Sequence, residues 1–99
     1  MIERLVFGKI YAMINSRNLS LKNGIYLGKS YSHLAHIILF KKEDDLYIKK
    51  FKNYNLENKS KLWINDFESE EININRFNLF EREYLHKLVK EKNYKNKNL

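Results

Sequence analysis

The feature that most constrains the fold is the absence of cysteine from a chain of only 99 residues. Neither a disulfide framework nor a thiolate metal site can reinforce the structure, so one hydrophobic core has to stabilise it. A chain of this length allows a single domain with a core of modest size and excludes two domains. Because 43% of the residues are hydrophobic, an ordinary value for a globular protein, we expect the chain to fold.

The same features indicate where the protein resides. No stretch of the sequence approaches the roughly 20 apolar residues that a membrane-spanning helix needs. We therefore expect a soluble protein that does not contact a membrane. The lack of cysteine makes the reducing cytoplasm its expected location.

Positive charge is the strongest compositional signal. The net charge is +7, and residues 1–40, 41–61, 62–83 and 84–99 carry +4, +3, −4 and +4. Basic surface attracts nucleic-acid phosphates, and an acidic stretch between basic flanks is a place where a divalent metal would be tolerated. A simpler explanation stays open, because Lys outnumbers Arg 15 to 4 and the heavily used Lys, Asn, Ile and Tyr all have A/T-rich codons. Base composition can produce part of the charge.

The first part of the chain predicts a β-hairpin. Residues 7–15 (FGKIYAMIN) have the β-branched and tyrosine content of a strand, although the apolar positions of residues 2–14 also fit a helix. Residues 16–24 are rich in the Ser, Asn and Gly of turns. They would return the chain into a second strand over residues 24–28, beside the first.

The middle of the chain is ambiguous. Apolar residues recur at helical spacing over residues 31–41, which favours a short amphipathic helix, while a buried strand over residues 35–40 stays open. Residues 46–54 fit either a second short helix or a strand. The polar residues 55–60 predict a loop.

The last third of the chain contains the best-marked element. Two short segments with residues that are common in strands, 62–64 (LWI) and 72–74 (INI), predict strands. A helix is then expected over residues 79–92. Asn78 is a suitable N-cap, and Glu81 three residues later completes a capping-box pattern.

Two short motifs in this chain resemble those of the GIY-YIG endonuclease family. Residues 8–11 (GKIY) match the first name-giving motif with one inserted residue, and residues 26–28 (YLG) match the second. Lys29 directly follows the glycine of the second motif. Glu81 lies twelve residues before Asn93, and the pair is similar to the family's metal-binding glutamate and trailing asparagine.

This resemblance, which spans residues 7–93, implies both a fold and an activity. The fold would be a single α+β domain over residues 1–93, with a small antiparallel sheet of about three strands flanked by helices. Residues 94–99 would form a basic tail outside it. The activity would be that of a small endonuclease that hydrolyses phosphodiester bonds of DNA and depends on a divalent metal, Mg²⁺ or Mn²⁺.

The resemblance also implies a role for each motif residue. Glu81 would be the metal ligand. The phenol of Tyr11 or Tyr26 would orient or deprotonate the attacking water, and Lys29 would contact the phosphate. Asn93 would fix the geometry of the substrate or of the hydrated metal.

One family residue has no counterpart here. The arginine that clamps the phosphate in the family is absent from residues 31–36 (YSHLAH). His36 lies near the missing position, and a protonated imidazole could replace part of the charge without the bidentate geometry of arginine. The residues also have structural interpretations, namely cross-strand packing for Tyr11 and Tyr26 and helix capping for Glu81.

Two other functions stay open. The protein could bind DNA or RNA without cutting it, through phosphate contacts from a group of lysines and through neighbouring aromatic rings. The lysines are Lys41, Lys42, Lys49, Lys50 and Lys52, and the aromatic residues are Phe51 and Tyr54. Alternatively, it could be a phage or mobile-element protein that binds a host protein partner and blocks a host nucleoprotein defence complex stoichiometrically.

Overall fold

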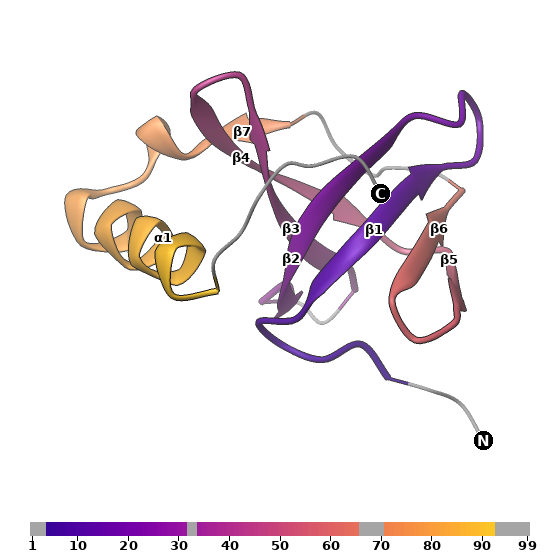
Figure 1. Cartoon of the computed structure of the whole chain (residues 1–99). Helices are drawn as coiled ribbons and strands as arrows, with labels where there is room; N and C mark the ends of the chain where they lie inside the picture. Colours follow the sequence, from indigo (N-terminus) through magenta and orange to yellow (C-terminus); the bar gives the residue numbers. More distant parts are fainter. Residues whose placement is uncertain (1–3, 32–33, 66–70, 93–99) are drawn as a thin grey trace.

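The computed structural model describes residues 4–31, 34–65 and 71–92. These residues form one seven-stranded mixed β-sheet with a single α-helix that follows it in the chain (Figure 1). The strands are β1 (Ile10–Asn15), β2 (Leu21–Lys29), β3 (His36–Lys42), β4 (Asp45–Phe51), β5 (Tyr54–Glu57), β6 (Lys61–Ile64) and β7 (Ile72–Asn73). A 3₁₀ turn, η1 (Ile74–Arg76), leads into the α-helix, α1 (Leu79–Glu91).

The strand order across the sheet is β5-β6-β1-β2-β3-β4-β7. Strands β1 to β4 form an antiparallel meander, and the β5–β6 hairpin then returns to the far side of β1, where β6 pairs with β1 in parallel. The expected sheet of about three antiparallel strands flanked by helices is therefore wrong. The chain builds a larger mixed sheet and places only one α-helix against it in the part that the structure describes.

Strand β3 explains much of this difference. Residues 31–41 have helical spacing of their apolar positions, but they also contain an uninterrupted apolar run from Ile37 to Phe40. In the structure Ile38 and Leu39 are both fully buried although they point to opposite faces of the sheet. A central strand buried on both faces gives such a run, so the helix over residues 31–41 is wrong and the alternative buried strand is confirmed.

Two further ambiguous or polar segments are also strands. Residues 45–51 form β4, which settles the second segment that could have been helical. The loop expected over residues 55–60 is wrong, because Tyr54–Glu57 pairs with β6 as β5. The hairpin that joins β5 to β6 turns at Asn58 and Lys59, which both have positive φ (54° and 67°). That geometry is typical of a type I′ turn, whose usual Asn-Gly sequence is replaced here by Asn-Lys.

Alternation along the strands divides the buried side chains between two cores. The tyrosine face of the sheet consists of Tyr11, Met13, Tyr26, Ile38, Phe40, Phe51, Leu62 and Ile64. The helix face consists of Ile25, Leu39, Leu46 and Ile48, joined by Ile74 of η1 and by Leu85 and Leu88 of α1. Neighbouring residues of a strand point to opposite faces, so α1 covers one side of the sheet only.

The best-marked elements of the sequence are found where they were expected. The β1–β2 hairpin is confirmed, with Tyr11 opposite Gly24 and with Tyr11 and Tyr26 in the same core. The C-terminal helix is confirmed with its capping box, in which Asn78 Oδ1 accepts the Glu81 N–H at 2.8 Å. Neither helical segment within the described ranges is long and apolar enough to cross a membrane.

Candidate nucleic-acid interface

Tyr26 and His36 form a hydrogen-bonded pair on the tyrosine face. The Tyr26 hydroxyl lies 2.8 Å from His36 Nδ1. The His36 ring stacks on Phe51 with ring centroids 5.3 Å apart, and the edge of Tyr54 lies 5.2 Å away. Lys29 is the residue opposite His36 in the β2–β3 pairing. The structure therefore brings together three predicted site residues, Tyr26, Lys29 and His36.

The environment of this pair favours its uncharged forms. Burial, with smaller effects of Tyr54 and Tyr11, raises the pKa of Tyr26 above its usual 10.0. Burial, with a smaller effect of Lys29, lowers the pKa of His36 below its usual 6.5. A neutral imidazole can accept the phenol proton at Nδ1. The phenol is then held as a donor, which does not suit the predicted role of deprotonating a water at neutral pH.

Tyr11 has a structural partner for its hydroxyl. Its side chain is 1% exposed, and its oxygen accepts the backbone N–H of Val6 at 2.9 Å. The Lys9 ammonium lies 5.1 Å from the centre of the ring. The hydroxyl therefore satisfies a backbone donor of the N-terminal segment, which is the packing role that a strand tyrosine usually has.

Glu81 is separated from the tyrosines by the sheet. Its carboxylate accepts the Asn78 N–H at 3.3 Å in the capping box, and it lines the same groove on the helix face as Leu27. Tyr26, the residue before Leu27, points to the opposite face. The structure thus does not bring Glu81 together with Tyr11, Tyr26 or His36. Asn93 lies outside the described residues.

The five lysines predicted to bind nucleic acid are also divided between the faces. Lys49 pairs with Ile38 and Lys42 covers the Tyr47 ring, so both belong to the tyrosine face. Lys50 pairs with Ile37 and Lys41 pairs with Leu46, which places both on the helix face. Lys52 follows β4 in the connection to β5. These five side chains do not form a single patch.

A groove on the tyrosine face is lined by two lysines and by uncharged side chains that can donate hydrogen bonds. It has a volume of about 150 Å³, and its basic residues are Lys22 and Lys49. The remaining lining residues are Met13, Asn15, Asn18, Ser20, Phe40 and Glu71. We call it the lysine groove. Lys22 lies opposite Met13 in the hairpin, and its ammonium lies 4.8 Å from the centre of the Phe40 ring.

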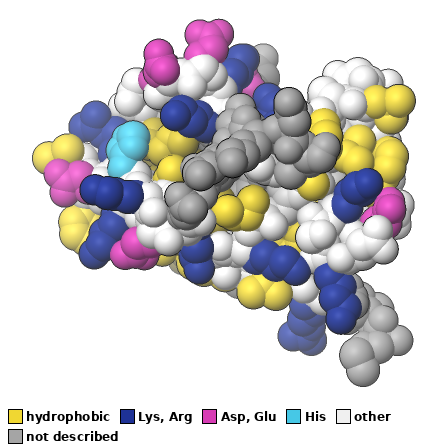
Figure 2. All heavy atoms as spheres, in the orientation of Figure 1, with side chains coloured by type: hydrophobic (Ala, Val, Ile, Leu, Met, Phe, Trp, Pro, Cys, Tyr) yellow, Lys and Arg dark blue, Asp and Glu magenta, His cyan; other side chains and the backbone are white. Residues whose placement is uncertain are grey.

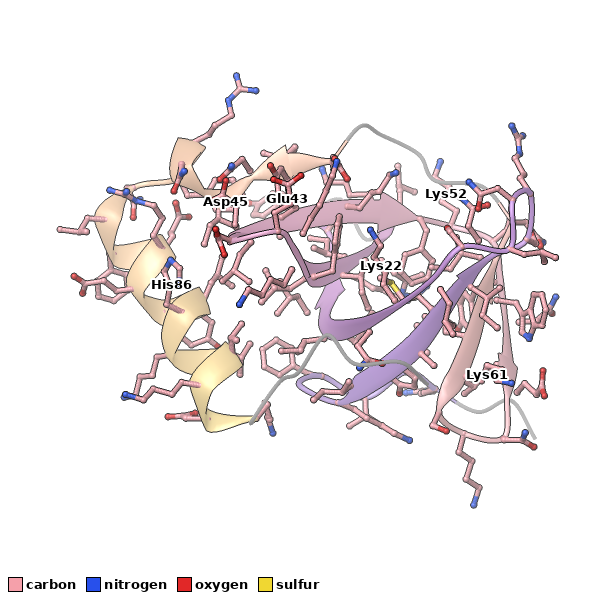
Figure 3. The ribbon with its side chains drawn as sticks, turned by 45° about the horizontal axis from the view of Figure 1, so that its top comes forward. Lys22, Glu43, Asp45, Lys52, Lys61 and His86 are labelled. Atoms are coloured by element: carbon pink, nitrogen blue, oxygen red, sulfur yellow. The ribbon has the colours of Figure 1, made fainter. Side chains whose placement is uncertain are left out.

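Lys22 was not among the sequence-predicted contacts. The signal that could have found it is the hairpin itself, because pairing β1 with β2 places Lys22 on the same face as Met13. Figure 3 shows Lys22 over the sheet, away from α1, while Glu43 and Asp45 lie closer to the helix. Glu71 at the rim of the groove forms an ion pair with Lys42, and this hydrogen bond raises the pKa of Lys42 above its usual 10.5.

The strands carry a larger excess of positive charge than α1 does. The described strands carry seven lysines against two carboxylates, whereas α1 carries three basic and three acidic side chains. The lysines are Lys22, Lys29, Lys41, Lys42, Lys49, Lys50 and Lys61, and the carboxylates are Asp45 and Glu57. Figure 2 shows basic side chains spread over the whole visible face, over the region of α1 as well as over the sheet.

The metal expected from the resemblance has no cluster of ligands within the described ranges. No three His, Cys, Asp or Glu side chains there are close enough to one another to hold an ion. A scan against protein-family models finds no match to the chain, and searches of curated proteins and of solved structures find none either.

Proposed function

We propose that this protein binds nucleic acid by its phosphates, through the lysine groove on the tyrosine face, without cutting it. The observation that carries the proposal is the concentration of positive charge on the sheet, with seven strand lysines beside a helix of balanced charge. An unbalanced basic surface attracts a polyanion and releases its counterions. Lys22 and Lys49 give this attraction a defined place.

The lining of the groove favours phosphate over bases. Two ammonium groups are accompanied by the amides of Asn15 and Asn18 and the hydroxyl of Ser20, which can all donate to phosphate oxygens. The Glu71 carboxylate, which also lines the groove, forms an ion pair with Lys42. The Phe40 ring is only 2% exposed and cannot stack on a base. The volume of about 150 Å³ is also below the roughly 300–1,000 Å³ of most small-molecule sites. Backbone contacts of this kind predict affinity with little sequence preference.

Cleavage has less support from the geometry. The carboxylate and the phenols of the predicted nuclease site lie on opposite faces of the sheet, and the raised pKa of Tyr26 disfavours a phenolate. The metal-dependent endonuclease stays a prediction from the motif resemblance. Inhibition of a host complex through a protein partner also stays a prediction.

Binding can be tested by fluorescence anisotropy with labelled single-stranded and duplex DNA between about 50 and 200 mM salt. The test variant is Lys22→Gln with Lys49→Gln. The matched control is Lys87→Gln with Lys90→Gln, which removes the same charge from α1. We expect the test variant to bind more weakly and its salt dependence to fall by about one unit of slope per lysine. An equal loss in the control, or no binding by the wild type, would contradict the proposal.

The same DNA also tests cleavage. It is incubated with the protein and Mg²⁺ or Mn²⁺, alongside Glu81→Gln and Tyr26→Phe, and the products are separated on a gel. Metal-dependent cleavage that both variants lose would restore the endonuclease prediction. Intact DNA, under conditions where anisotropy shows binding, is the result that we expect.

A further inference from the structure

A second groove lies between α1 and the helix face of the sheet. Its volume is about 380 Å³, and Glu81 is the only charged residue that lines it in the part of the chain that the structure describes. The other lining residues are Phe7, Leu27, Ile37, Ile48, Phe77, Phe80, Tyr84 and Leu85. We call it the apolar groove. Its walls come from the segment before β1, from strands β2 to β4, from Phe77 after η1 and from α1.

Large aromatic side chains at this groove are exposed to water. Phe80 is 83% exposed, Phe7 54% and Tyr84 49%. The capping box accounts for Asn78 and Glu81 at the start of α1, but it gives no reason for phenylalanine between them. A contiguous exposed apolar patch on a small protein marks an interaction surface.

The patch is shaped to accept a copy of itself. Phe80 protrudes at the first turn of α1, directly beside the hollow that Leu27, Ile37 and Ile48 line. A protruding ring and a cavity in one patch can satisfy each other in two copies related by a two-fold axis, because such an interface is made from the same residues on both sides. Each Phe80 ring would then enter the partner's groove.

The exposed area is close to what a stable dimer needs. At roughly 200 Å² per aromatic side chain, the exposed fractions of Phe7, Phe80 and Tyr84 correspond to about 370 Å². A standard interface buries about 800 Å² per partner, of which about 60% is apolar. The three aromatic side chains therefore supply about three quarters of the apolar share.

The charge distribution favours a second copy over an acidic partner. Two molecules of net charge +7 repel each other, and Lys41 and Lys50 lie on the helix face, but no lysine or arginine of the described residues lines the apolar groove itself. Contact through the apolar groove therefore brings together lining residues that include no basic side chain among the described residues. An acidic partner would be attracted to the lysines instead.

We propose that the protein forms a two-fold dimer through the apolar groove, with Phe80 of each copy seated in the groove of the other. The lysine groove lies on the opposite face of the sheet, so dimerisation leaves it accessible. The two proposals are therefore independent of each other.

Sedimentation velocity over a concentration series tests the dimer. The test variant is Phe80→Ser, which removes an exposed ring and leaves the capping residues intact. The control is Leu19→Ser, which removes another exposed apolar side chain (68%) from the turn between β1 and β2. Circular dichroism checks that both variants fold.

We expect the wild type and Leu19→Ser to dimerise with the same Kd, and Phe80→Ser to raise that Kd at least about tenfold. A wild type that stays monomeric at every concentration would overturn the dimer. So would a Phe80→Ser variant that associates as tightly as the wild type. A monomeric Phe80→Ser variant should bind a short oligonucleotide as well as the wild type does, which separates failure of the dimer from failure of nucleic-acid binding.

Discussion

Replacing Gly24 with alanine tests how closely the tyrosine face is packed. Gly24 lies in β2 opposite Tyr11, and a Cβ atom there would lie 2.6 Å from Cγ1 of Ile38. It would also lie 2.8 and 2.9 Å from Cε and Sδ of Met13. These separations are far below van der Waals contact, so the neighbours have to move.

The expected cost follows from which neighbours can move. Met13 is flexible and can turn its thioether away, but Ile38 is fully buried and β-branched, so it has few rotamers to adopt. Overpacking of this kind costs about 1–3 kcal/mol of unfolding free energy. Alanine offsets about 0.4–1 kcal/mol of this loss, because the unfolded chain has less conformational entropy with alanine than with glycine. We expect a net loss of about 1–2 kcal/mol, which lowers the Tm of a domain of this size by roughly 5–15 °C.

Thermal and urea unfolding measure the loss, and a double-mutant cycle locates it. Met13→Val removes the two Met13 atoms nearest the new methyl group, so the double variant should be more stable than the sum of the single effects predicts, by at least about 0.5 kcal/mol. A Gly24→Ala variant as stable as the wild type would refute the packing argument. Additive effects in the cycle would refute the contact with Met13.

Three other predictions concern stability. Burial, with a smaller effect of Lys29, lowers the pKa of His36 in the folded protein. The contribution of His36 to the free energy of unfolding is therefore complete above about pH 6.5 and is lost as the pH falls below that value. Urea midpoints measured from about pH 5 to 8 should fall more steeply towards acid in the wild type than in His36→Phe. Asn78→Ala should cost about 1 kcal/mol in thermal unfolding because it removes the acceptor for the Glu81 N–H, whereas Asn78→Asp should retain stability. Gly28→Ala should cost about 1–2 kcal/mol although the site has space, because its φ is +91°, and an unchanged Tm would contradict this.

The elements predicted correctly are those with local signals. The capping residues of α1 contact backbone atoms within the same turn, so three residues of sequence are enough to mark its start. The β1–β2 hairpin is similar, because turn-forming residues lie between two strand-like segments. These signals do not depend on the rest of the fold.

The elements predicted wrongly depend on distant partners. Residues 36–42 are a strand because strands lie on both sides of them and both faces are covered, which the run of apolar residues cannot reveal by itself. Tyr54–Glu57 is polar enough to be a loop, and it becomes a strand by pairing with β6. The parallel pairing of β6 with β1 joins segments about 50 residues apart and has no local signature.

The same distinction applies to the candidate sites. The sequence by itself determined the excess of lysine, the capped helix and the hairpin that carries Tyr11 and Tyr26, because composition and short-range hydrogen bonding are properties of local residues. Only the tertiary structure decided which face each side chain occupies. Strand alternation and the position of α1 put Glu81 on the helix face, and they put Lys22 beside Lys49 on the tyrosine face. A shift of one residue reverses the face to which a strand side chain points, so such a site depends on the register of the whole sheet.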